Sequence, residues 1–399
     1  MRKLIVVSAI ALLLAPAFSQ AKSLEELLVE KGVITQGEAS AAGASKVWWD
    51  KGSRIEFPDK GFTVGVRTEL QTRYTFTDQA KEVPNTSSFE IKRARLVVSG
   101  TALNKEFSYY MAPDFAGEAK LRDAWLQWHT TECTALKMGQ FKPAISRQYN
   151  NAKTLLQFPD RAIATEVIAL ERQPGLEGRV DLLEDSALRI SAQMFNGESD
   201  GEGINRPGVD TRHTGVVAAR WAAMGQMDPF VEGDVGWTED PAVNVGAAYA
   251  YSDHRNDIET LGVVKSATHR LSTDVSYKQS GFSFHGEFYW GRAEAENDEY
   301  EKFDIIGFYT QAGYFLLPKE LEVAARYSYV DCDDGKAMDE HCIGNKTLDG
   351  VDVSINYYFW EHYLKAQLAW AFLRENRVHG DENMNTNLSL IHISEPTRL

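Results

Sequence analysis

The chain has 399 residues, with 42 Lys and Arg against 57 Asp and Glu, a formal net charge of -15, and 43% hydrophobic residues. This composition excludes a disordered chain, and the acidic balance excludes a generally basic nucleic-acid-binding protein. A helical membrane bundle is also excluded, because the one long apolar run lies at the extreme N-terminus.

The first residues predict an export signal peptide over residues 1–21. Met1-Arg2-Lys3 gives a positive start, an apolar run follows from Leu4 to Ala17, and Ser19-Gln20-Ala21 offers small residues for a cleavage site. The run is shorter than the roughly 20 apolar residues that a spanning helix needs. We therefore expect an exported bacterial protein.

Residues 22–60 are predicted to form a short periplasmic helical segment followed by a linker. Leu24, Leu27 and Leu28 recur at helical spacing, and the stretch 39–45 is rich in Ala, Ser and Gly, as linkers are. The main body of the protein is expected to begin at residue 61.

From Phe62 onward, apolar and polar residues alternate with a period of two, as in 62–76 and 188–194. This period predicts strands with one apolar face. A soluble sandwich would bury that face, whereas an outer-membrane barrel turns it toward lipid. Segments of about 10–15 residues, aromatic residues at segment ends, and connections that alternate short and long favour the barrel.

The predicted fold is therefore all-β, a transmembrane antiparallel β-barrel over residues 61–387. Fifteen strands are expected, at 62–76, 89–101, 105–114, 120–129, 135–142, 174–183, 186–196, 213–223, 242–252, 268–279, 281–293, 303–316, 320–330, 350–360 and 362–374. Residues 228–238 are left as a periplasmic connection, because Gly233 and Gly236 weaken a strand there. Bacterial single-chain barrels have an even number of strands, so sixteen are expected and the last is predicted to be missing.

The C-terminal end has a different character. Residues Leu388 to Arg398 resemble the translation of a transposase adapter used to build sequencing libraries. We predict that the genuine polypeptide stops near Asn387 and that residues 388–399 are an adapter-derived artefact without a functional role.

The three cysteines predict one disulfide at most. Cys332 and Cys342 lie in a polar stretch with nine residues between them and could pair outside the cytoplasm, which leaves Cys133 unpaired. The sequence contains neither a CxxC pair nor a Cys/His cluster. No metal site and no cofactor are predicted.

Several motifs resemble the phosphate-selective porin O/P family. They are the helical stretch Leu27-Leu-Val-Glu-Lys-Gly-Val-Ile34, the run Phe89-Glu-Ile-Lys-Arg-Ala-Arg-Leu96 leading to Gly100, Asp123-Ala-Trp125, and Met138-Gly-Gln-Phe-Lys-Pro143 with Arg161 and Arg172 after it. The resemblance covers roughly residues 23–387 and is most specific between 89 and 180. It implies a 16-stranded, typically trimeric barrel of the bacterial outer membrane that passes small anions, phosphate above all.

The resemblance also implies that Arg and Lys line the lumen and that an inward-folded loop narrows it. The stretch 143–173 is too long for a simple turn and is the candidate for that loop. The anion pathway is therefore assigned to its cations and to inward cations on the strands: Lys142, Arg147, Lys153 and Arg161 in the loop, and Arg67, Arg73, Arg93, Arg95, Arg179, Arg189, Arg220, Arg326 and Lys365 on strands. Rings of such side chains serve anion pores, and the guanidinium fork matches phosphate oxygens.

Two other interpretations stay open, and a third is set aside. Many of these cations could simply pair with inward carboxylates such as Glu69, Asp123 and Glu177. Inward Trp125, Tyr289 and Tyr358 could instead stack sugars in a general or sugar-specific porin. Ser283 and His285 share a strand face but lie about 7 Å apart, too far for a catalytic pair, so no enzyme is predicted.

Acidic stretches at 198–202, 294–301 and 331–340 are expected in surface loops, where lipopolysaccharide and outer-membrane lipid are the neighbours. No nucleic-acid partner is expected.

Overall fold

The computed structural model describes residues 29–32, 35, 46–50, 52–79, 84–197, 212–258, 262–295, 302–333, 342, 345–378 and 384–395. The predicted signal peptide and most of the predicted helical segment lie outside the described residues, as does most of each acidic loop. No helix among the described residues is long and apolar enough to cross a membrane.

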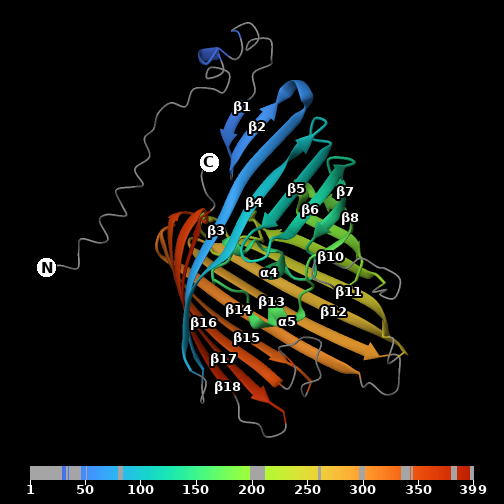
Figure 1. The fold of residues 1–399 in the computed structure, drawn as a ribbon, viewed down its shortest axis with the longest axis vertical. Coiled ribbons are helices and arrows are strands. Elements are labelled where there is room, and N and C mark those ends of the chain that lie inside the picture. The colour runs from blue at the N-terminus through green and yellow to red at the C-terminus, as the bar shows by residue number, and fades with distance from the viewer. Residues whose placement is uncertain are drawn as a thin grey trace, which may run out of the picture.

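Sixteen antiparallel strands form a closed barrel, which confirms the predicted fold class (Figure 1). They are β3 (Phe62–Gln79), β4 (Thr86–Ala102), β5 (Phe107–Asp114), β6 (Lys120–His129), β7 (Thr134–Phe141), β8 (Gln173–Leu182), β9 (Leu188–Phe195), β10 (Thr214–Met224), β11 (Ala242–Ile258), β12 (Gly262–Gln279), β13 (Phe282–Ala295), β14 (Phe303–Leu317), β15 (Leu321–Asp331), β16 (Asn345–Trp360), β17 (Leu364–Arg377) and β18 (Met384–Glu395). Each strand pairs with the next along the chain, and β18 pairs with β3 to close the ring.

The alternation predicted from the sequence places polar side chains inside and apolar ones outside. On β17, Leu368 and Trp370 are 52% and 43% exposed, whereas Gln367 on the same strand is 2% exposed. This arrangement inverts that of a soluble sandwich and suits a barrel surrounded by lipid.

The prediction that the last strand is missing is wrong for this structure. Met384–Glu395 forms β18, which pairs with Lys365 to Glu375 of β17 and with Leu70 to Gln79 of β3. The stretch can close the barrel because it alternates as a strand must: Ile391 and Ile393 face outward, while Leu390 and His392 are buried inside. The adapter origin of residues 388–398 stays a prediction, which resequencing of the coding region would test.

Part of the predicted linker is also a strand pair. β1 (Lys46–Trp49) and β2 (Ser53–Phe57) form a hairpin, and one turn of 3-10 helix, η1 (Pro58–Lys60), leads on to β3. β2 pairs with Phe62 to Val66 of β3, on the N-terminal side of the part of β3 that pairs with β18. Trp49 also stacks on Trp360, with 6.0 Å between ring centroids, so the hairpin contacts the end of β16 as well.

The strands differ in length around the ring. β5 to β9 have 8 to 10 residues, whereas β11 and β12 have 17 and 18. Residues 253–268, expected as a loop, are mostly strand, because β11 and β12 pair from Ala242 and Lys278 out to Ile258 and Gly262. Their polar composition lacks the alternation used to predict strands, because both faces of a strand can contact water where it extends past the bilayer.

Two connections fold into the barrel. The inner loop, residues 142–172 between β7 and β8, contains α4 (Arg147–Asn150), the 3-10 turn η2 (Lys153–Leu155) and α5 (Ile163–Ile168). Figure 1 shows α4 and α5 inside the ring of strands. From the opposite, short-turn end, the β10–β11 connection (residues 225–241) brings the fully buried Glu232 against the inner loop. As predicted, this connection contains no strand; the remaining short turns include η3 (Glu184–Ser186).

Candidate functional site

The inner loop is packed against one side of the lumen, formed by β12–β17, which we call the anchor wall. The α5 side chains Ala164, Val167 and Ile168 share an apolar cluster with Tyr289 and Tyr309 of β13 and β14. The opposite side of the lumen, β3–β10, contacts the loop mainly at its two ends and through Arg73, and we call it the open wall.

Two wall arginines hold the middle of the inner loop. Arg73 of β3 donates to both carboxylate oxygens of Asp160 at 2.8 and 2.9 Å. Arg326 of β15 donates to the carbonyls of Asp160 and Arg161 at 2.9 and 3.2 Å, and its guanidinium also lies over the Phe158 ring. Since both arginines are almost fully buried, they act as fasteners of the loop.

Gln157 and its neighbour attach the loop to β13–β17. Ser354, Asn356 and Gln367 all donate to the Gln157 carbonyl at 2.9 to 3.1 Å. Lys365, with no exposed surface, donates to the carbonyl of Leu156 at 2.5 Å. This ammonium is therefore engaged by the backbone of the loop.

The start of α4 is fixed by buried carboxylates. Glu287 of β13 accepts from the backbone N–H groups of Arg147 and Gln148 at 2.8 and 3.1 Å, as an anion at a helix N-terminus does. The Arg147 guanidinium is fully buried, donates to the Tyr309 hydroxyl at 2.5 Å, and lies 3.6 Å from Glu232 of the β10–β11 connection. The inner loop is thus held both by the barrel wall and by the β10–β11 connection.

Among the described residues, two cavities lie beside the loop along the open wall. The first, of about 260 Å³, lies between the inner loop and β3–β7. The second, of about 510 Å³, lies toward the short turns and is bordered by β7–β12 and by residues 226–230. Lys137, Lys142 and Asn150 line both cavities, so they mark the junction where the two adjoin, and we call the two cavities together the path.

The first cavity is strongly basic. Its lining includes two carboxylates, Glu69 and Asp123, against seven cationic side chains: Arg67, Arg95, Lys137, Lys142, Lys153, Arg161 and Arg172. The second is less so, with three carboxylates against six cations: Lys137, Lys142, Arg147, Arg179, Arg189 and Arg220. Basic side chains therefore outnumber carboxylates in both cavities.

The predicted pathway residues therefore divide into nine that line a cavity and four that do not. Eight of the nine are Arg67, Arg95, Lys142, Lys153, Arg161, Arg179, Arg189 and Arg220. Arg147 borders the second cavity but has no exposed side-chain surface. The other four line neither cavity: Arg73, Arg326 and Lys365 fasten the loop, and Arg93 donates to Gln71 on the wall.

Most wall cations on the path are each paired with a carboxylate. Arg67 lies 3.2 Å from Glu69, and Arg95 lies 2.8 Å from Asp114. Arg220 donates to both oxygens of Asp274 at 2.7 and 2.8 Å. Lys142 differs, because its ammonium donates to the backbone carbonyls of Asn150 and Asn151 at 3.2 and 2.9 Å.

The loop cations also perturb one another. Burial, with Arg161 as the next cause, lowers the pKa of Lys153 to about 7. Burial alone would raise the pKa of Glu166, but the ammonium of Lys153 and the guanidinium of Arg161 lower it, so this loop carboxylate stays ionised. The positive charge of the first cavity is therefore sensitive to pH near neutrality.

Two path cations were absent from the predicted set. Arg172 ends the inner loop and lies 3.0 Å from Asp123. Lys137 shares the inward parity of Ala135 and Phe141, whereas Leu136 and Met138 are exposed on the outside. Strand parity alone could have identified Lys137.

Aromatic residues also line the first cavity: Tyr110 and Trp125, whose ring centroids lie 5.5 Å apart, and Phe141. Of the three considered for sugar stacking, Trp125 lines the first cavity. Tyr289 and Tyr358 are buried, with hydroxyls bonded to Ser146 and Glu322 at 3.0 and 2.7 Å.

Ser283 and His285 are likewise buried, and the Ser283 hydroxyl accepts from Gln157. Among the described residues, no three His, Cys, Asp or Glu side chains are grouped to hold a metal ion.

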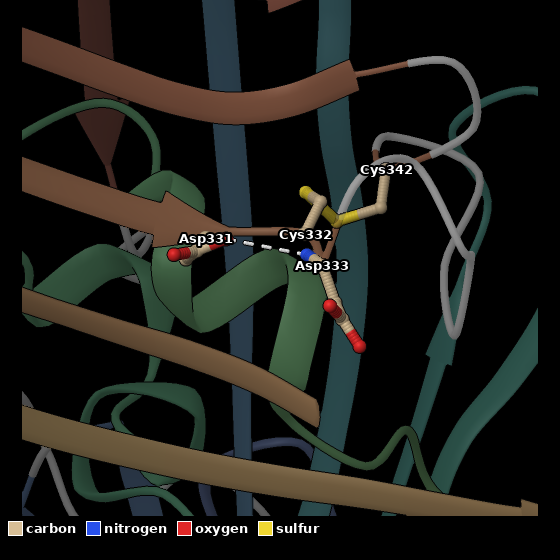
Figure 2. The surroundings of a disulfide bond; sticks show 4 residues. All are labelled: Asp331, Cys332, Asp333 and Cys342. Carbon is tan, nitrogen blue, oxygen red and sulfur yellow. Dashed lines mark hydrogen bonds between the residues drawn. A yellow bond between two sulfur atoms is a disulfide. The ribbon is translucent and has the colours of Figure 1, made fainter. Parts of the chain in front are cut away.

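Cys332 and Cys342 are joined by a disulfide beside α5. Their sulfur atoms lie 2.06 Å apart, both residues are fully buried, and they belong to the apolar cluster that contains Ala164 and Ile168. Figure 2 shows the bond next to the green helical ribbon of the inner loop. Cys133, on a turn at the other end, is free and exposed.

Comparisons with known proteins find a porin family and solved outer-membrane channels of similar fold. The family model described as phosphate-selective porin O and P matches residues 64–392. Solved structures with a similar fold include the outer-membrane channel DcaP of Acinetobacter baumannii (TM-score 0.61, 10% identity, 84% of this chain and 98% of that one). An anion-selective porin from Comamonas acidovorans is also similar (0.60, 9%, 84% and 99%), as is a trimer form of OmpT from Vibrio cholerae (0.53, 13%, 84% and 99%). A search of curated protein sequences finds no match.

Proposed function

Because this chain belongs to the family of phosphate-selective porins O and P, we propose that it is an outer-membrane channel selective for small anions, phosphate or polyphosphate among them. The observation that carries the proposal is the first cavity, where seven cationic side chains face two carboxylates beside the inner loop. An ion that crosses the barrel along the open wall passes this cavity.

The physical basis is electrostatic. Cations that line a narrow, low-dielectric passage attract anions and repel cations, and rings of Arg or Lys are the usual lining of anion pores. Conduction also requires weak binding at several sites, because a tight site would trap the ion. The pairing of Arg67, Arg95 and Arg172 with wall carboxylates fits this requirement, since each cation is already partly satisfied.

The test is the reversal potential of the channel in a planar bilayer under a KCl gradient at pH 6. The wild-type channel is expected to prefer chloride, and added phosphate should block the chloride current. Replacing Lys142 and Lys153 together with Gln should lower the anion preference by up to about thirtyfold, since each unit charge at about 4 Å in water is worth about 1 kcal/mol.

Lys60→Gln with Lys319→Gln is the matched control. It also removes two ammonium groups, but from exposed positions that line neither cavity. It should leave the reversal potential unchanged. A wild-type channel that prefers potassium, or prefers neither ion, would contradict the proposal and favour a general or sugar-specific porin on the same barrel.

We also infer a homotrimer, surrounded by outer-membrane lipid and lipopolysaccharide. An 8-residue strand tilted by about 40° rises only about 20 Å, less than the apolar band of about 25 Å that such barrels present to lipid. β5, β7 and β9 have this length, so that side of the barrel suits contact with other copies better than contact with lipid. The mass of the complex extracted in mild detergent tests this; a monomeric mass would contradict it.

A further inference from the structure

Lys137 lies at the junction of the two cavities and is held by three groups. Its ammonium is 2.8 Å from Glu177 of β8, 4.3 Å from the centre of the Phe141 ring and 5.7 Å from that of Trp125. The side chain is 16% exposed, so part of it reaches the path. An anion that moves from one cavity to the other passes within reach of this ammonium.

The carboxylate partner of Lys137 is itself held in place. One oxygen of Glu177 faces Lys137, and the other accepts from the Gln193 side-chain amide. The carbonyl oxygen of that amide accepts from the backbone N–H of Ala144 at 2.8 Å, at the start of the inner loop. Glu177 is therefore a fixed anion beside Lys137, on the wall of the second cavity.

We propose that Glu177 is a built-in competitor for the passing anion at Lys137, and that this competition determines how long the anion stays at the junction. The inference rests on the proposed function. A lysine stem has four rotatable carbons, so the ammonium can turn from Glu177 toward an arriving anion while its stem stays against the Phe141 and Trp125 rings. When the anion leaves, Glu177 takes the ammonium back.

Lys142 has a different role in the same junction. Its ammonium is bonded to two backbone carbonyls, and neither is a charged competitor. Burial, reinforced by Arg172 and Arg161, lowers the pKa of the Lys142 ammonium. Lys137 is therefore the member of this pair to which the competition applies.

The decisive variant is Glu177→Asp, because it keeps the charge and shortens the side chain that reaches Lys137. Competition predicts that phosphate blocks the chloride current at about threefold lower concentration and stays bound longer. Glu177→Gln, which keeps the bond to Gln193 but loses the charge, should lower the half-blocking concentration about tenfold, the size expected for gaining one charge-assisted hydrogen bond.

Glu294→Asp is the matched control, because Glu294 pairs with Lys302 at 3.3 Å and lines neither cavity. It should leave the phosphate block unchanged. If Glu177→Asp blocks as the wild type does while Glu177→Gln tightens, Glu177 acts only as a diffuse charge and the inference is overturned; no effect of either variant overturns it too.

The wild-type record separates the two ideas. An anion-selective channel whose block is insensitive to Glu177 contradicts only the competition. A wild-type channel without anion selectivity contradicts the proposed function and the competition together. Heat-modifiable migration on gels verifies that each variant has folded, and Glu177→Asp carries the test should Glu177→Gln fail to assemble.

Discussion

The two sides of the lumen use the same residue types for opposite purposes. On the anchor wall, Arg326 and Lys365 are buried and bonded to the backbone of the inner loop. On the open wall, Arg67 and Arg189 keep 26% and 48% of their side-chain surface exposed and border a cavity. Inward position alone therefore does not define a pathway residue; what decides is whether the inner loop covers it.

The comparison also explains why the path is off-centre. The inner loop and the β10–β11 connection meet at Glu232, whose carboxylate accepts from the backbone N–H of Gln157 at 3.0 Å. The Glu232 backbone N–H in turn donates to the Leu155 carbonyl at 3.0 Å. Together these segments fill the side of the lumen next to the anchor wall and leave the open wall to solvent and ions.

The largest effect is expected from breaking the anchor wall. Arg326→Met leaves Asp352 and two loop carbonyls without their donor, and removing one partner of a buried ion pair costs about 3–5 kcal/mol. The free energy of unfolding, measured by urea titration in lipid vesicles, should fall by this amount, and single-channel conductance should rise because the loop loosens.

Arg189→Met provides the comparison from the open wall. Arg189 also pairs with a carboxylate, Asp181 at 2.5 Å, but it is half exposed, and such pairs contribute about 1 kcal/mol or less. Equal losses of stability in the two variants would refute the distinction between the walls.

A smaller effect is expected at the outer end of the anchor wall. Replacing Cys332 and Cys342 with Ser removes the disulfide, which closes a loop with a sequence separation of 10. The free energy of unfolding should fall by about 3 kcal/mol, as the loop-entropy relation gives for a loop of this size. Cys133→Ser should cost little, because this cysteine is exposed and free. Mass spectrometry of unreduced protein should show the linked peptide; two free thiols at these positions would contradict the bond.

The sequence was sufficient for the ring of strands because period-two alternation is local. Strand parity correctly placed Arg67, Arg95 and Arg220 on the lumen side, and the length of 143–173 correctly indicated a loop folded inward. Both signals depend only on neighbours along the chain.

The sequence was insufficient where the partner lies far away along the chain. Arg326 meets a loop carbonyl 166 residues earlier, and Lys365 one 209 residues earlier. No local pattern distinguishes these cations from Arg220. The closing strand β18 was missed for another reason: its resemblance to an adapter sequence removed a stretch whose alternation alone would have predicted a strand.

The smallest expected effect sharpens the comparison by changing one charge on the path without a large change in shape. Burial, reinforced by Arg161, lowers the pKa of Lys153 to about 7, so its ammonium is charged below that pH and neutral above it. The anion preference should therefore fall as pH rises from 6 to 8, by up to about fivefold for one unit charge. Lys153→Arg, which stays charged throughout this range, should hold the reversal potential nearly constant. Lys153→Gln should also be flat, but at the lower preference. A pH dependence that persists in Lys153→Arg would show that another group titrates on the path.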